Sequence, residues 1–361
     1  MTEVIRNQYA PDIVSAPGET LLEILESRGM SQAEFADRTG RPTKTINEIV
    51  KGKAAITPET ALQFEFVLGI PATFWNNREQ QYRESIAIKK EAKRLETQAD
   101  WLDVIPYTAM AQAGWVPRAQ NKGEKLYHAL KFFGVASPSS WLEVWRNQQL
   151  AFRQSKYFAV DQGAVAAWLR KGELEAQQIV CEEYDAPRFR RVLGAIRTLT
   201  RDLPSNFAEI VVNECKGAGV KVVFVPELPR TRVWGATRWV SPSYALIQLS
   251  LRYKLDDHLW FTFFHEAAHV LLHGKREIFL EVDEAERDER ETQADEFARD
   301  WLIPPNAYKN FRRKGATSCA AISRFAFELG ITAGIVVGRL QHDRLLPRTH
   351  CNHLKKSVGW A

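Results

Sequence analysis

Two histidines four residues apart, His265 and His269, lie in an otherwise apolar run from Trp260 to Leu272. The run has the length and composition of a buried helix, and residues four apart on a helix project from the same face. Both imidazoles therefore point the same way, with Glu266 one step round the helix. A buried polar group without a partner costs on the order of 1–3 kcal/mol. The fold must supply this polar face with a partner.

A divalent metal ion is the partner that this HExxH pattern favours. Two imidazoles with a carboxylate beside the ion are what zinc-dependent peptide hydrolysis requires. The five-residue motif also occurs by chance, so a pair of core histidines beside a solvated Glu266 is the alternative. A third ligand on a buried face would favour zinc over that alternative.

An acidic, helix-favouring run at residues 281–300 offers a third ligand. Most carboxylates in such a run form a solvated face. Glu291 instead shares its helical face with Ala294, Ala298 and Leu302, so it needs a cation there. One turn later, Asp295 is placed to accept the second ring N–H of a metal-bound histidine. The expected zinc ligands are His265, His269 and Glu291, with Asp295 supporting them and water at the open position.

Glu266 is the expected catalytic residue. Zinc lowers the pKa of its bound water to roughly 7, and Glu266 would take the proton and pass it to the leaving amine. His273 is expected to cap the helix or support a ligand, because Gly274 is a natural stop. The sequence leaves open whether His342 or Tyr308 serves as a second electrophile.

Three short strands are predicted before this helix, at residues 221–225, 233–240 and 244–251. We expect a small antiparallel sheet beside the helix. An extended peptide could add to its edge as a further strand. The alternative is a sheet that only covers the helix.

The N-terminal quarter carries a second pattern, a helix-turn-helix. Helices are predicted at residues 20–28, 32–38 and 43–50, and Gly40 provides the turn between the last two. Ile46 is spaced to pack the last helix against its neighbours. A further long helix is predicted to begin near residue 72.

Polar side chains on the outward face of the helix at residues 43–50 suit a DNA groove. Residues 38–53 hold five bases and one acid, although residues 1–60 are slightly acidic. The expected DNA contacts are Gln32, Arg41, Thr43, Lys44, Thr45, Asn47 and Lys51. A homodimer is expected, because such proteins pair to match two half-sites. The alternative is a small helical bundle that docks a protein.

The length of 361 residues allows two or three domains. We expect an α+β, mostly helical chain. Its expected parts are a helix-turn-helix bundle at 1–85, a helical middle region with aromatic packing at 86–200, a zinc domain at 201–345 and a C-terminal tail at 346–361. The net charge of +5 neither demands nor excludes nucleic acid.

No signal peptide and no membrane-length apolar run is expected, which predicts a cytoplasmic protein without a membrane partner. The four cysteines show no CxxC spacing and are expected to be reduced thiols. Cys351 with His350 and His353 forms a weak metal-like cluster near the C-terminus.

Two segments resemble known families. Residues 15–85 resemble the Xre-type helix-turn-helix of the HigA (VapI-like) antitoxins, on residues 17–19, 30–34, 44–49, 56–61 and 74–75. Residues 200–345 resemble the ImmA/IrrE metallopeptidases, on residues 234–236, 261–273, 291–298, 303–304 and 335–340. The second resemblance implies a gluzincin-like site with zinc on His265, His269 and Glu291, and Glu266 catalytic. Many members carry Asn where Asp295 stands.

The resemblances imply two competing functions. In the first, a regulator binds operator DNA and its zinc peptidase domain cleaves a regulatory protein, either itself or a partner repressor. In the second, the chain is an antitoxin-like repressor that binds DNA and a HigB-like toxin, while the zinc domain serves structure or sensing.

Overall fold

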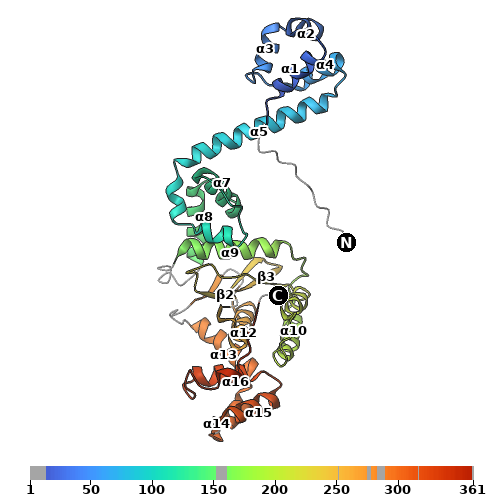
Figure 1. Ribbon diagram of the computed structural model, residues 1–361. Helices are drawn as coiled ribbons and strands as arrows, with labels where there is room; N and C mark the ends of the chain where they lie inside the picture. Colours follow the sequence, from blue (N-terminus) through green and yellow to red (C-terminus); the bar gives the residue numbers. More distant parts are fainter. Residues whose placement is uncertain are drawn as a thin grey trace. The chain divides into compact units, whose positions relative to one another are not determined.

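The computed structural model describes residues 14–151, 161–250, 252–274, 278–282, 289–315 and 317–359, with the side chains of Ala92, of residues 146–151 and of Ile278, Glu281 and Val282 excepted. The chain divides into two compact units, residues 1–97 and 98–361. It is mostly helical with one small sheet, which confirms the expected α+β class (Figure 1). The division into four parts remains a prediction, and the N-terminal residues 1–13 lie outside the described residues.

The first unit is a bundle of helices. They are α1 (Pro17–Ser27), α2 (Gln32–Thr39), α3 (Thr43–Val50), α4 (Pro58–Leu68) and the long α5 (Ala72–Glu96). Its core is apolar and aromatic: Phe64 lies between Phe35 and Trp75, with ring centroids 4.9 and 5.4 Å away. Ile46 is fully buried in this core, as its spacing predicted.

Local chemistry fixes the helix-turn-helix. The Ser31 hydroxyl accepts a hydrogen bond from the Glu34 backbone N–H and so caps the start of α2. Gly40 ends α2 in the left-handed conformation with a φ of 66°, which glycine adopts without strain. These two residues set where α2 begins and where the chain turns into α3.

The second unit contains the remaining elements. Before the sheet they are η1 (Ala99–Asp103), α6 (Tyr107–Gln112), α7 (Lys122–Phe133), α8 (Pro138–Ala151), α9 (Gln162–Gln177), α10 (Ala186–Leu199) and α11 (Phe207–Lys216). The aromatic residues expected to pack here do so: the ring of Trp101 lies 6.0 Å from that of Phe133 and 5.4 Å from that of Trp141.

The sheet is mixed, whereas an antiparallel sheet was expected. Its strands are β1 (Val220–Phe224), β2 (Val233–Ser241), β3 (Tyr244–Leu249) and β4 (Ile278–Val282), in the order β1-β3-β2-β4. β1 pairs with β3 in parallel, while β2 is antiparallel to both of its neighbours. A tight turn joins β2 to β3, which makes these two strands antiparallel. β1 lies on the other side of β3 and runs parallel to it. Leu251, the end of the third predicted strand, lies outside the described residues.

β4 also corrects the sequence analysis. The acidic run at residues 281–300 was expected to be helical, but its first residues end this strand. The helix α13 (Glu289–Leu302) begins only at Glu289, and residues 283–288 lie outside the described residues.

Helices cover both faces of the sheet (Figure 1). On one face lies α9, where the Trp168 indole N–H donates to the Val225 carbonyl and the Gln248 side chain donates to the Trp168 carbonyl. On the other face lies α12 (Asp256–Leu272), which carries the HExxH motif and contacts β2 and β3. The motif is therefore held between the sheet and the C-terminal helices.

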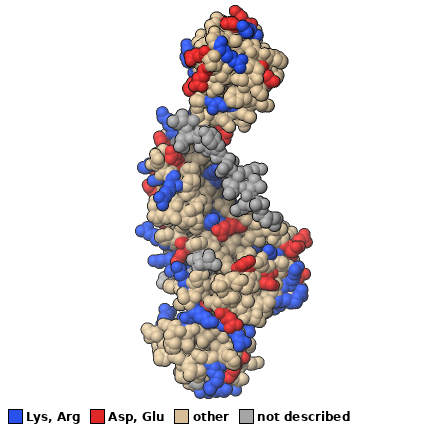
Figure 2. Space-filling model, turned by 45° about the vertical axis from the view of Figure 1, so that its right-hand side comes forward, with Lys and Arg blue, Asp and Glu red and all other residues tan. Residues whose placement is uncertain are grey.

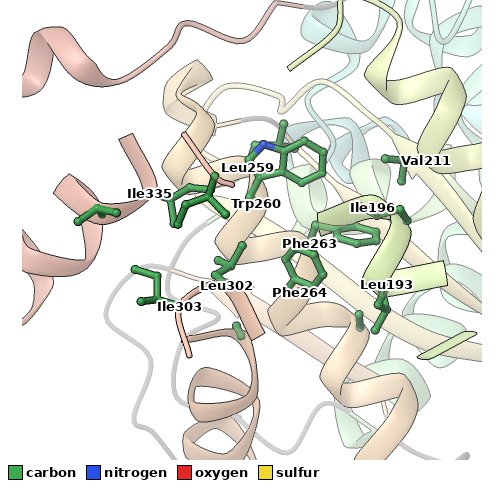
Figure 3. Packing of buried hydrophobic residues seen from close by; sticks show 14 of the residues in the cluster. Leu193, Ile196, Val211, Leu259, Trp260, Phe263, Phe264, Leu302, Ile303 and Ile335 are labelled. Atoms are coloured by element: carbon green, nitrogen blue, oxygen red, sulfur yellow. The ribbon is translucent and has the colours of Figure 1, made fainter. Parts of the chain in front are cut away.

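The core around α12 is densely aromatic (Figure 3). Trp260, Phe263 and Phe264 are at most 1% exposed, and the rings of Phe263 and Phe264 lie beside Leu193 and Ile196 of α10. Burying one such side chain contributes about 1.5–3 kcal/mol relative to leaving it in water. This packing fixes the rotation of α12 and thereby the direction of its histidines.

The C-terminal elements are α14 (Pro305–Arg313), α15 (Cys319–Leu329), α16 (Ala333–His342) and η3 (Asn352–Leu354), with η2 (Arg252–Lys254) before α12. Cys319 and Cys351 form a disulfide, which corrects the expectation that all cysteines are reduced. Cys181 and Cys215 are free thiols as expected. Spacing alone could not reveal the pair, because 32 residues separate its members.

No single described helix is long and apolar enough to cross a membrane. Taken together, α15 and α16 have the length and apolar composition of a membrane span, but a sharp bend separates them. On the face drawn in Figure 2, basic and acidic side chains are interspersed without a field of one sign, in keeping with the modest net charge.

Candidate metal centre

The first two candidate ligands come from α12. This helix begins at Asp256, earlier than the apolar run by itself indicated, and its first turn holds two acids that favour the positive end of the helix dipole. His265 and His269 are 2% and 1% exposed, and Glu266 is fully buried. The polar face predicted from the sequence is thus enclosed by protein.

α13 brings Glu291 to the two histidines. Glu291 Oε2 lies 3.0 Å from His265 Nε2 and 3.7 Å from His269 Nε2, and the two Nε2 atoms are 3.0 Å apart. Bonds of about 2.1 Å in tetrahedral zinc place ligand atoms about 3.4 Å from one another. The three edges of this triangle bracket that value, so the donors fit zinc in both type and spacing.

The outer ring nitrogens of both histidines also have partners. His265 Nδ1 lies 3.0 Å from Asp295 Oδ1, one turn after Glu291 on α13. His269 Nδ1 lies 2.8 Å from the Nδ1 of His273, whose other nitrogen contacts Gln293. Such contacts hold a ligating imidazole in one orientation and one tautomer. Asp295 and His273 therefore lie in contact with His265 and His269, and their supporting roles remain predictions.

Burial and hydrogen bonding together set the protonation states at this site. Burial lowers the pKa of His269 to about 4, so its ring is neutral near pH 7 and can donate a lone pair to a metal. Burial alone would raise the pKa of Glu291, but its hydrogen bonds with His265 and His269 outweigh burial and hold the pKa below its usual range. A neutral imidazole and a carboxylate are the forms that bind zinc.

Two residues of β2 position Glu266, a role that no sequence pattern indicated. The Thr237 hydroxyl donates to Glu266 Oε2 at 2.5 Å and lies 3.1 Å from its backbone carbonyl. Gly235 lies against the same carboxylate, because a Cβ at this position would be 2.5 Å from Glu266 Oε1. Gly235 lies within residues 234–236, which carry part of the resemblance, but no sequence pattern placed Gly235 or Thr237 against Glu266.

A side chain of β4 packs against the histidines of the candidate metal centre. The Phe279 ring stacks on His269 with centroids 3.9 Å apart and also lies near His273. β4 is an outer strand of the sheet and pairs only with β2 in the described residues. The expectation that a peptide adds to an exposed edge applies to this strand and remains a prediction.

The two candidate electrophiles have other partners. The Tyr308 hydroxyl donates to Asp343 Oδ2 at 2.6 Å, and His342 Nδ1 lies 3.2 Å from Asp343 Oδ1. Both side chains therefore contact the carboxylate of Asp343, the residue that follows α16. No described contact connects either of them to the three candidate ligands, so neither is favoured as an electrophile.

The candidate DNA contacts lie on one part of the first unit. Gln32 begins α2, and the others lie on α3 or directly beside it. None of the seven side chains is buried, whereas Ile46 and Ile49 of α3 are. The Arg41 guanidinium donates to the Gln63 side chain on α4, which fixes its direction. The face expected to meet DNA is therefore accessible.

Two segments of the chain match known protein families. Residues 21–75 match the helix-turn-helix family, and residues 238–341 match the IrrE N-terminal-like domain, which belongs to a metallopeptidase family. The chain joins a helix-turn-helix segment to an IrrE-like domain. Both resemblances drawn from the sequence are confirmed. The IrrE-like match contains all three candidate ligands, Glu266 and Asp295.

Individual relatives are similar over short stretches. An uncharacterized HTH-type transcriptional regulator of Escherichia coli, YddM, is 34% identical over 61 residues, which span 17% of this chain and 65% of the relative.

Two solved structures cover about a quarter of this chain. A HigA-family addiction module antidote protein from Coxiella burnetii is 32% identical, over 23% of this chain and 92% of its own, with a TM-score of 0.22. The Pseudomonas aeruginosa antitoxin HigA, solved with the higBA promoter, is 27% identical over 24% and 94%, also with a TM-score of 0.22.

Proposed function

We propose that this chain is a DNA-binding transcription regulator whose IrrE-like domain is a zinc peptidase that cleaves a regulatory protein, either the chain itself or a partner repressor. The observation that carries the proposal is the convergence of His265, His269 and Glu291 beside the buried Glu266. Three protein ligands with a fourth position left for water are the arrangement of catalytic zinc, whereas structural zinc is closed by four.

The residues of the chain have distinct roles in this proposal. When bound by the three ligands, zinc supplies a Lewis acid that polarises the scissile carbonyl and lowers the pKa of a water molecule. Glu266 takes the proton of the attacking water and delivers it to the leaving amine. Thr237 holds the Glu266 carboxylate in the direction that this transfer needs. Asp295 holds the ring of His265 against rotation.

The test of the peptidase uses one isosteric change. The purified full-length chain is incubated with zinc, alone and with candidate repressors, and products are followed by mass spectrometry. Wild type should give a zinc-dependent fragment that Glu266→Gln does not give, while both proteins hold equal amounts of zinc by elemental analysis. Glu289→Gln, at an exposed acid on the same α13, is the matched control and should cleave like wild type. Equal cleavage by Glu266→Gln would refute the catalytic role.

The DNA half has its own test. Lys44→Ala with Asn47→Ala removes two side chains from α3 and should abolish binding to the chain's own promoter in a mobility-shift assay. Lys90→Ala, at an exposed base on α5, is the control of equal charge. Circular dichroism should show both variants folded. Sequence-specific binding by the double variant would refute α3 as the reading helix.

Self-association of the first unit is part of the same proposal. Leu62 and Phe66 lie four residues apart on α4 and are 49% and 82% exposed, which supports an apolar pairing surface. Light scattering of the wild type should give the mass of a dimer, and Phe66→Ser should shift the mass toward the monomer. A monomeric wild type bound to one half-site would contradict this expectation.

The antitoxin-like repressor remains the alternative function. It predicts that Glu266→Gln still represses the promoter and still binds the product of a neighbouring toxin gene. A pull-down of that product together with the mobility-shift assay distinguishes the two, because only the peptidase proposal requires a functional difference between Glu266→Gln and wild type.

A further inference from the structure

A second group of metal-ligating side chains lies apart from the HExxH centre. It consists of Cys319, His350 and Cys351, and one ligand atom from each lies within 4.8 Å of the others. The sequence placed His350 beside Cys351, but only the fold brings in Cys319 from the start of α15. His353, which the sequence grouped with them, is not part of this set.

The chemistry of this group suits a soft divalent ion. Two thiolates and an imidazole are ligands that zinc binds well, whereas magnesium and calcium prefer oxygen ligands. Cys319 is the first residue of an 11-residue helix, where the positive end of the dipole stabilises a thiolate. Cys351 is buried while His350 is exposed, so the group is open to solvent on one side.

We propose that the reduced Cys319–His350–Cys351 group binds zinc, so that a disulfide and a zinc complex are alternative cross-links at one place. A dithiol reductant converts the Cys319–Cys351 bond into two thiols and is itself oxidised to a disulfide. Zinc then binds the two thiolates and the His350 imidazole with release of two thiol protons. Water fills the fourth position.

The position of the group explains what such a cross-link would do. Residues 351–358, here called the tail strap, run from Cys351 to the beginning of α12. Ser357 bridges to Leu255, the Val358 N–H donates to the Lys254 carbonyl, and Lys355 pairs with Asp257 at 2.7 Å. Either cross-link ties the start of the tail strap to α15 and so holds its other end against the helix that carries HExxH.

Cobalt distinguishes this group from the HExxH centre. Only a thiolate ligand gives an intense sulfur-to-cobalt charge-transfer absorption, and the HExxH centre contains no sulfur. The full-length chain is reduced with dithiothreitol, desalted without oxygen and titrated with Co²⁺. Wild type should bind two equivalents, one of which gives the sulfur band, whereas the oxidised chain should bind one equivalent without the band.

Variants assign the band to residues. Cys319→Ser should lose the band and one equivalent of metal, while Cys181→Ser, at a free cysteine elsewhere, should keep both. His350→Ala leaves both thiols in place and should weaken zinc binding by about 10-fold or more. His269→Ala should keep the sulfur band, so failure of the HExxH centre does not affect this result. A reduced wild type without the band, or a band that survives in Cys319→Ser, would overturn the proposal.

Discussion

Replacing Lys355 by alanine should strongly destabilise the second unit. The Lys355 ammonium lies 2.7 Å from Asp257 Oδ2, and the two side chains are only 8% and 7% exposed. Removal of one partner leaves a buried carboxylate without its counter-charge, and breaking such a pair costs about 3–5 kcal/mol. Because so little of the pair is exposed, solvent screening reduces this cost only slightly.

The assay is urea unfolding followed by tryptophan fluorescence, since Trp260 lies in the core of this unit. Lys356→Ala is the matched control, because among the described residues its ammonium contacts two backbone carbonyls, at 3.2 and 3.4 Å on the surface, and its loss should cost under about 1 kcal/mol. Asp257→Asn added to Lys355→Ala should restore part of the lost stability by removing the uncompensated charge. If Lys355→Ala costs no more than the control, the tail strap is not packed as described.

Three further outcomes are expected. Gly235→Ala should lower peptide hydrolysis by about 100-fold, because the new Cβ displaces the Glu266 carboxylate, while Gly194→Ala, which meets no atom within 4 Å, should leave the rate unchanged. Tyr308→Phe should be less stable than wild type near pH 7 but equally stable in acid. Burial alone would raise the pKa of Asp343, but hydrogen bonds from Tyr308, Arg339 and His342 outweigh burial and hold the pKa below its usual range. The stability that the Tyr308 hydrogen bond contributes is therefore lost as the pH falls through the native pKa of Asp343. Unfolding at several pH values checks this. Chelation should lower the melting temperature in calorimetry, because the candidate ligands join α12 to α13, and equal melting with and without chelator would contradict a bound metal.

The convergence of the three candidate ligands could be predicted because helical periodicity determines which side chains share a face. His265 and His269 share a face at any rotation of α12, and the apolar neighbours of Glu291 showed that its carboxylate faces inward. Their burial and mutual distances agree with that reasoning. The helix-turn-helix was equally accessible, since Ser31 and Gly40 determine its turns through local chemistry alone.

Features that depend on long-range packing could not be predicted. Thr237 is an ordinary strand residue until α12 places Glu266 against it. The parallel pairing of β1 with β3 depends on strand order, which no local pattern encodes. The Cys319–Cys351 bond likewise depends on how the tail strap returns across the unit.

The tail strap has a consequence for the timing of synthesis. The ribosome makes the helix-turn-helix segment first and α12 much later, while the residues that secure the start of α12 follow only at 355–358. Glu291 also follows both histidines along the chain. A nascent polypeptide therefore contains the whole first unit before its candidate metal centre is complete. If the chain is its own substrate, this order prevents a molecule from cleaving itself before its synthesis is complete.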